Sequence, residues 1–184
     1  MVVDAALLGR AGELKRELVT FSQQPQYERA ASQVLAEHGN GPAALDEQRL
    51  MLVWDYFVLE HKLPNGQTVV EQFVDAHPRM SGPEREMVLR WRDVVQGPFE
   101  VQRRDGPALV VVNLVDELSY RVRSNVGPGV FGSVPRGAFL ITRLGAIGDE
   151  WMLSGPTSVL RPADRNVAYQ LALTMASRTP AAKS

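Results

Sequence analysis

Cysteine is absent from the 184 residues of this chain. Disulfide bonds, thiolate catalysis and cysteine-ligated zinc are therefore excluded. An excess of charge of either sign is also missing, because 20 lysines and arginines face 21 aspartates and glutamates, for a formal net charge of −1. This balance gives no general electrostatic attraction to nucleic acid or to an anionic membrane.

Long apolar runs are lacking as well. No stretch approaches the roughly 20 apolar residues that span a bilayer. The N-terminus has no basic start followed by a long apolar segment, and charged residues follow at once in Glu13 to Glu17. We therefore expect no secretory signal and no membrane partner, and we expect a cytoplasmic location.

Helical spacing of apolar residues dominates the first half of the chain, and prolines and glycines divide it into about five helices. The longest strongly apolar run extends from Leu50 to His61. We expect it to form a core helix that packs on both sides. It follows Gly41-Pro42 and ends near the turn signal Leu63-Pro-Asn-Gly66. Thr68 with Glu71, and Ser81 with Glu84, predict capping boxes at the start of the next two helices.

The period changes after Gly97-Pro98, where short alternating segments separated by turns predict strands as far as Leu160. Five or so short strands suggest a small antiparallel β-barrel. A last helix is expected to follow Pro162. The predicted fold class is α+β, with a helical domain over 1–97, a small β-barrel over 98–163, and a C-terminal helix with a frayed tail over 164–184.

Three segments carry a resemblance to a known family. They are Arg49 to Phe57, Leu63 to Phe73, and Phe99-Glu-Val followed by a strand pair that ends in Tyr120-Arg-Val. Together they resemble an uncharacterised bacterial family, some of whose members carry a C-terminal SEC-C zinc motif. The resemblance covers roughly residues 49–155 and implies an architecture rather than an activity. The chain departs from those members at its C-terminus, because without cysteine it cannot hold that zinc.

The string Gly127-Pro-Gly-Val-Phe-Gly132 matches the glycine pattern of dinucleotide sites. Such a site needs a strand before the glycines and a helix after them, because the helix N-terminus holds the pyrophosphate. Here Pro135-Arg-Gly137 follows and then a strand, so we interpret 124–137 as a long loop between strands. Loops often carry binding residues, and whether this loop binds a ligand stays an open question.

Acid–base and metal sites are not indicated by the ionisable residues of the central helix. Asp55 and His61 point about 120° apart on a helix, and Glu60 and His61 also diverge. No metal-binding pair of histidines four residues apart occurs. We therefore predict no catalytic residue, no metal ligand and no cofactor. His61, the one polar residue on an otherwise apolar arc, is the residue to test.

The strand region holds a candidate binding surface. Arg121 and Arg123 alternate along one strand and so face one way, with Phe131 and Arg136 in the following loop. Arginines beside an aromatic ring suit single-stranded nucleic acid. Aspartates and glutamates in the same region nearly balance this charge, which favours a solvated strand face.

Our leading hypothesis is a non-catalytic protein-interaction module whose partner is another protein or a second copy of the chain. The first alternative is a nucleic-acid-binding adaptor that uses the barrel face, and the second is an enzyme with an unrecognised site.

Overall fold

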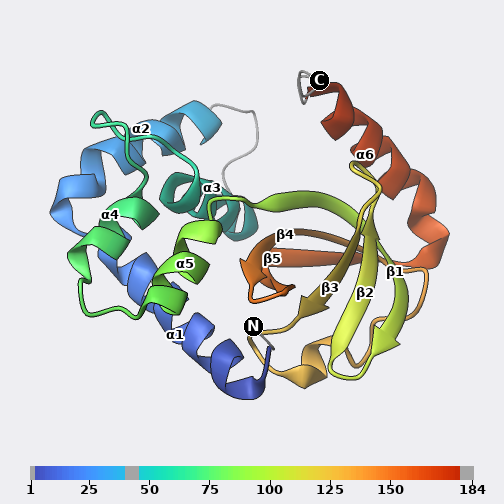
Figure 1. The fold of residues 1–184 in the computed structure, drawn as a ribbon. Coiled ribbons are helices and arrows are strands. Elements are labelled where there is room, and N and C mark those ends of the chain that lie inside the picture. Colours follow the sequence, from blue (N-terminus) through green and yellow to red (C-terminus); the bar gives the residue numbers. More distant parts are fainter. Residues whose placement is uncertain (1–2, 40–45, 179–184) are drawn as a thin grey trace, which may run out of the picture. The chain divides into compact units, whose positions relative to one another are not determined.

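The computed structural model describes residues 3–39 and 46–178 (Figure 1). The chain divides into two compact units. One holds the residues up to Val94 together with Gly145–Asp149, and the other holds Val95–Leu144 and the chain from Glu150 onward. The predicted domain boundaries differ from this division, because the C-terminal helix belongs with the strands. The predicted tail 179–184 and the Gly41-Pro42 signal lie outside the described residues.

The first unit consists mainly of helices. In chain order they are α1 (Ala5–Ser22), the short 3-10 helix η1 (Pro25–Tyr27), α2 (Glu28–Gly39), α3 (Glu47–Leu59), α4 (Val69–Ala76) and α5 (Gly82–Arg90). Both predicted capping boxes are confirmed, with Thr68 and Glu71 at the start of α4 and Ser81 and Glu84 at the start of α5. Each box supplies hydrogen-bond acceptors to amide groups that a helix N-terminus otherwise leaves without partners.

The core of this unit is made of large apolar side chains that are fully buried, including Leu14, Leu18, Phe57, Leu59, Phe73 and Trp91. The indole of Trp91 needs a hydrogen-bond partner because it is completely buried. Its Nε1–H donates to the carbonyl oxygen of Ala146 at 3.0 Å. Residues 145–149 thus take part in the packing of the helical unit.

α3 is buried along only part of its length. Phe57, Val58 and Leu59 are almost completely buried, whereas Leu50, Met51 and Leu52 are 41, 48 and 38% exposed. The prediction that the whole run packs on both sides is therefore wrong for its first turn. α1, α2 and α4 contact α3, and the apolar side chains of α3 that become buried are Val53 and Phe57 to Leu59.

The second unit is a β-barrel with a helix beside it. Its strands are β1 (Val95–Asp105), β2 (Ala108–Asn113), β3 (Ser119–Arg123), β4 (Phe139–Ile147) and β5 (Glu150–Leu160). They close in the order β1-β2-β3-β5-β4, with β4 returning to pair with β1. Alternate residues point inward and form one apolar cluster, which includes Phe99, Val101, Leu109, Val111, Tyr120, Val122, Leu140 and Leu153. The coarse prediction of a mixed α+β fold is confirmed.

One strand pair corrects the prediction of an antiparallel arrangement. β1 pairs antiparallel with β2 and β4, and β2 pairs antiparallel with β3, but β3 and β5 are parallel, with Val122 opposite Trp151. A closed ring of five strands cannot alternate in direction at every step, because five is odd. At least one parallel pair is therefore required. Such a pair needs a long crossover connection rather than a tight hairpin, and the chain between β3 and β5 includes the loop 124–137 and β4.

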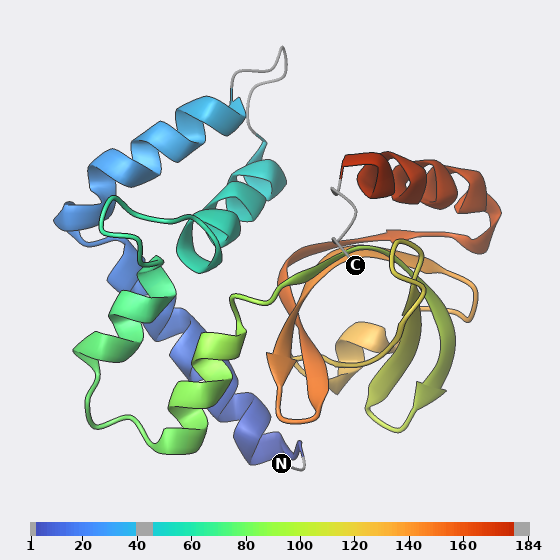
Figure 2. The same cartoon turned by 45° about the horizontal axis from the view of Figure 1, so that its top comes forward.

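Two further elements complete this unit. The 3-10 helix η2 (Pro128–Phe131) lies in the loop between β3 and β4, within the outline of the barrel in Figure 2, and Phe131 joins the barrel core. After η3 (Pro162–Asp164), α6 (Arg165–Arg178) lies along β1 and buries Ala168 and Ala172. The loop interpretation of the glycine string agrees with this structure, because β4 rather than an α-helix follows it.

Candidate functional site

Carboxylates neutralise the predicted basic face of β3. Arg121 pairs with Asp105 of β1, and its Nε lies 3.3 Å from Oε1 of Glu150. Nη1 of Arg123 lies 3.4 Å from the other oxygen of Glu150, and the two side chains are only 11 and 16% exposed. Phosphate binding normally uses a net positive surface, and these ion pairs remove much of the positive charge from β3.

Phe131 is not on a surface at all. Its side chain is 3% exposed and packs in the barrel core, so the expectation that it lies on a binding surface is corrected. An aromatic ring loses more contact with water inside the barrel than on an exposed loop, and η2 turns the ring inward. Arg104 donates a hydrogen bond to the carbonyl oxygen of Phe131. Arg136 is exposed, and the predicted surface is therefore split.

His61 lies in the loop between α3 and α4. Its ring is half-buried and lies 6.3 Å from the ring centre of Tyr56 and 5.8 Å from that of Phe57. Within the described part of the chain, no side-chain or backbone group hydrogen-bonds to its ring nitrogens.

The other two histidines are engaged by their own helices. Nδ1 of His38 lies 3.0 Å from the carbonyl oxygen of Val34, and Nδ1 of His77 lies 2.6 Å from that of Phe73. Because a carbonyl oxygen only accepts, Nδ1 is the donor in both contacts. Both histidines thus bond to a carbonyl oxygen four residues earlier, at the C-terminal ends of α2 and α4.

The loop that carries His61 is a well-defined turn. The backbone N–H of Leu63 donates to the carbonyl oxygen of Gln67, and that of Gly66 donates to Leu63, both at 2.8 Å. Gly66 has φ of +84°, which favours glycine. Oδ1 of Asn65 accepts from the Gln67 N–H at 3.1 Å. The predicted turn signal over 63–66 is confirmed.

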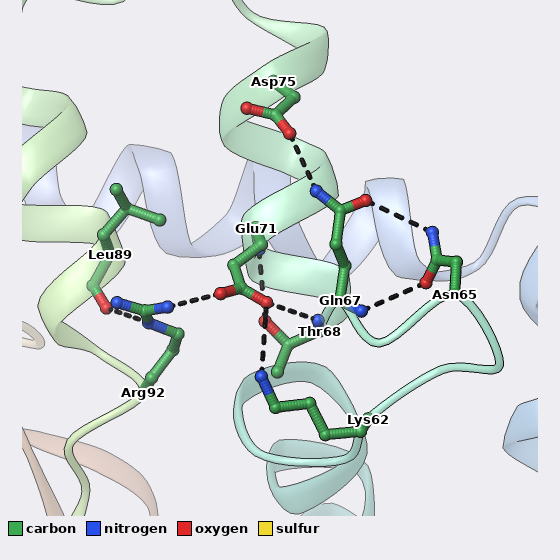
Figure 3. Close-up of polar contacts among 8 residues, drawn as sticks. All are labelled: Lys62, Asn65, Gln67, Thr68, Glu71, Asp75, Leu89 and Arg92. Atoms are coloured by element: carbon green, nitrogen blue, oxygen red, sulfur yellow. Dashed lines mark hydrogen bonds and ion pairs between the residues drawn. The ribbon is translucent and has the colours of Figure 1, made fainter.

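Side-chain contacts fix the two ends of this turn (Figure 3). Glu71, in the first turn of α4, accepts the Thr68 N–H at 2.7 Å, lies 3.8 Å from Nζ of Lys62, and pairs with Arg92. The bond from the Thr68 N–H is the main cause that lowers the pKa of Glu71 below its usual value, and Arg92 and Lys62 add to it. Glu71 therefore stays ionised and holds Lys62 beside α4.

A second set of contacts in Figure 3 holds Asn65. Its Nδ2 donates to Oε1 of Gln67 at 3.2 Å, and Nε2 of Gln67 donates to Asp75 at 3.0 Å. The turn is thus connected to both the first and the second turn of α4. Side chains that project from it are held on an ordered backbone.

A cleft of about 740 Å³ opens between this loop and the segment formed by η1 and α2. Its ionisable lining residues are Arg29, His61, Lys62 and Tyr27, and its carboxamides are Gln26, Gln33, Asn65 and Gln72. Among the described residues that line it there is no aspartate or glutamate. The cleft therefore combines positive charge with neutral hydrogen-bonding groups in a chain whose net charge is −1.

Buried Tyr27 and half-buried Gln72 connect the two walls of the cleft. The Tyr27 hydroxyl donates to Oε1 of Gln72 at 2.7 Å. Burial raises the pKa of Tyr27 above its usual value, so the hydroxyl is a neutral donor. With Oε1 engaged, the amino group of the Gln72 carboxamide can still donate hydrogen bonds.

Sequence reasoning found one residue of this cleft, His61, and missed the others. Arg29 and Lys62 are 33 positions apart, so no local pattern links them. The turn signal at 63–66 was the available clue that an ordered loop follows His61. Asp55, which the sequence places near His61, does not line the cleft, because it is 8% exposed and paired with Lys15 at 2.9 Å.

The described residues show neither a metal-binding cluster nor a helix that could span a membrane. Residues 3–39 and 46–178 contain no group of three or more histidine, aspartate or glutamate side chains arranged to hold a metal ion. Within the same ranges, no helix is both long and apolar enough to cross a membrane.

Comparisons with models of protein families, with curated proteins and with solved structures gave no match for this chain.

Proposed function

We propose that this chain is a non-catalytic protein-interaction module and that exposed residues 50–52, near the start of α3, are its contact surface. One observation carries the proposal: Leu50, Met51 and Leu52 are three consecutive large apolar side chains that are 38 to 48% exposed. Isolated exposed apolar residues are ordinary, but three consecutive ones occupy much of the circumference of one helical turn, and large exposed apolar surfaces mark sites of protein interaction.

The position of these residues on α3 supports the proposal. Leu50 stands seven residues before buried Phe57, and Leu52 stands seven before buried Leu59. Residues seven apart lie on one face of a helix, so the exposed side chains continue faces that are buried further along. A partner packed on residues 50–52 would extend this burial.

The start of α3 is also ordered before any partner binds. Asp46 caps α3, and its Oδ1 accepts the backbone N–H of Arg49 at 2.7 Å. A preformed helix loses little conformational freedom on association, which favours binding. The partner is a second protein or a second copy of this chain.

The test compares Met51→Glu with Gln48→Glu. Both substitutions add a negative charge to the exposed start of α3, but only the first replaces an apolar side chain. The full chain is used in size-exclusion chromatography with light scattering over a range of concentrations, and as bait in affinity capture from its source cells. We expect a dimer or a stoichiometric partner with the unchanged chain and with Gln48→Glu, and its loss with Met51→Glu.

A chain that stays monomeric and captures no stoichiometric partner would overturn the proposal. The same conclusion follows if Met51→Glu and Gln48→Glu bind equally. Circular dichroism of each variant checks that the helices are retained, as expected for substitutions at exposed positions.

A second candidate function is nucleic-acid binding by the barrel. It is supported by the closed order β1-β2-β3-β5-β4, because five-stranded barrels include the OB fold, which binds oligonucleotides and oligosaccharides. The ion pairs of Arg121 and Arg123 argue against a free basic face. Titration with single- and double-stranded DNA and RNA at low salt tests it, and binding lost in Arg121→Ala with Arg123→Ala would support it.

A further inference from the structure

We propose that the cleft between α2 and the α3–α4 loop is a binding site for a small polar anion. The cleft is separate from the apolar turn at 50–52, which does not line it. The inference therefore goes beyond protein interaction and does not depend on it. Four properties of the cleft lead to this ligand class: its charge, its carboxamides, its order and its size.

The first property is positive charge that the carboxylates of the described residues neutralise only in part. Arg29 is exposed and forms no ion pair with any residue that the structure describes. Lys62 has one carboxylate nearby, that of Glu71, at 3.8 Å, and this carboxylate already bonds to Arg92 and Thr68. Both cations therefore retain most of their capacity to attract an anion. Guanidinium groups bind carboxylates and phosphates with paired hydrogen bonds.

His61 adds a third group on the same wall as Lys62. Its ring nitrogens have no hydrogen-bond partner in the described part of the chain, although the ring is half-buried against Tyr56 and Phe57. The edge-on ring of Tyr56 and the tilted ring of Phe57 hold the imidazole in place. A neutral imidazole offers one donor and one acceptor, and a protonated one offers two donors.

The carboxamides give the site its second property. Side chains of this type both donate and accept, which suits hydroxyl, amide and carboxyl groups of a polar ligand. Two of the four are held in place: Oε1 of Gln72 accepts from Tyr27 at 2.7 Å, and Asn65 is bonded to Gln67 at 3.2 Å. Ligand groups would therefore meet donors and acceptors whose positions are already set, which reduces the entropy lost on binding.

The size and the lining of the cleft restrict the chemical class of the ligand further. About 740 Å³ lies within the roughly 300–1,000 Å³ that small-molecule sites occupy. Most of the lining residues have polar side chains, and the aliphatic ones are Ala30, Leu63 and Pro64. A hydrophobic ligand would leave the charged and carboxamide groups without partners. The ligand is therefore a small anion with a carboxylate or phosphate group and additional hydrogen-bonding groups.

The test is titration of the full chain, at constant ionic strength, with three probes: inorganic phosphate, citrate and glucose 6-phosphate. Calorimetry measures affinity, and backbone amide NMR shifts locate the site. We expect saturable binding of at least one probe, with the largest shifts over residues 26–33 and 61–65. Preference for citrate identifies a carboxylate ligand, and preference for the other two identifies a phosphate ligand.

Arg29→Gln and Lys62→Gln are expected to weaken this binding about tenfold each, as for loss of one charge-assisted hydrogen bond. The matched control is Arg79→Gln, which removes an exposed arginine of the same unit that does not line the cleft. The proposal is overturned if no probe saturates, or if Arg79→Gln weakens binding as much as Arg29→Gln. Met51→Glu should leave anion binding unchanged, which separates this test from that of protein interaction.

Discussion

Lys15 of α1 and Asp55 of α3 form an ion pair with 2.9 Å between Nζ and Oδ1, and their side chains are 17 and 8% exposed. The same ammonium group lies 5.6 Å from the ring centre of buried Trp91. A buried carboxylate on an apolar helix is costly unless a cation or hydrogen-bond donors meet it. Lys15 therefore explains how Asp55 is accommodated in an apolar helix.

Replacement of this carboxylate should destabilise the helical unit strongly. Asp55→Asn keeps the shape of the side chain but removes its negative charge, which leaves the largely buried ammonium group of Lys15 without its carboxylate. We expect the free energy of unfolding to fall by about 2–4 kcal/mol. Urea unfolding followed by circular dichroism measures it. The control is Glu13→Gln, which breaks an exposed ion pair with Arg10 and should cost less than about 1 kcal/mol. Equal losses would show that Lys15 and Asp55 contribute no more than a surface pair.

The contact between Arg10 and Glu84 should make stability depend on pH. Nε of Arg10 donates to Glu84 at 2.7 Å, and this bond, followed by those from Ser81, lowers the pKa of Glu84 from 4.5 to about 2. Because the folded pKa lies below the unfolded one, the carboxylate stabilises the fold above pH 4.5 and loses that effect as the pH falls toward 2.

The variant Glu84→Gln tests this linkage. It should be less stable than the unchanged chain at neutral pH, and the difference should shrink steadily as the pH approaches 2. Added salt should also reduce the difference, because Arg10 is partly exposed. Urea unfolding at a series of pH values supplies the measurement. A difference that does not change with pH would mean that the charge of Glu84 plays no part.

Phe131 should behave as a core residue of the barrel. Phe131→Ala leaves a cavity in a cluster that includes Phe99 and Leu140, and we expect a loss of about 3–5 kcal/mol. Its neighbour Val130 is 45% exposed, so Val130→Ala should change stability by less than about 0.5 kcal/mol. Thermal and urea unfolding compare the two. If both variants lose similarly little stability, Phe131 is not a core residue and could contact a ligand.

Two glycines should respond in opposite directions to alanine. Gly97 has φ of +153°, and a Cβ atom there would lie 2.8 Å from Oδ1 of Asn113, which is itself buried. Gly97→Ala should therefore destabilise the start of β1. Gly9 lies within α1 and a Cβ atom there meets nothing within 4 Å, so Gly9→Ala should stabilise the chain by roughly 0.5–1 kcal/mol. Loss of stability in both variants would contradict this reading.

Helix ends and turns were predictable because they depend on neighbouring residues. The boxes that begin at Thr68 and Ser81, and the turn over 63–66, each use groups within four positions of one another. The change of period after Gly97 likewise located the transition from helices to strands. α3 was only half-predictable, since periodicity identifies apolar faces but not how much of each face other helices cover.

In the barrel, the ion-pair partners, the direction of β5 and the position of Phe131 could not be predicted without the tertiary structure. The alternation of Arg121 and Arg123 is visible in the sequence, but their carboxylate partners come from β1 and β5. The direction of β5 beside β3 follows from closure of five strands, which no single segment encodes. The loop 124–137 was recognised as a connection, whereas the inward position of Phe131 depends on the barrel around it.

By itself the sequence determined the α+β class, the helix caps and the turn that follows His61, because these depend on local backbone geometry and hydrogen bonding. Only the tertiary structure brought Arg29 and Lys62 into one cleft and left residues 50–52 of α3 exposed. It also paired Asp55 with Lys15. Burial and charge pairing are decided by which distant segments meet, and that depends on the packing of the whole chain.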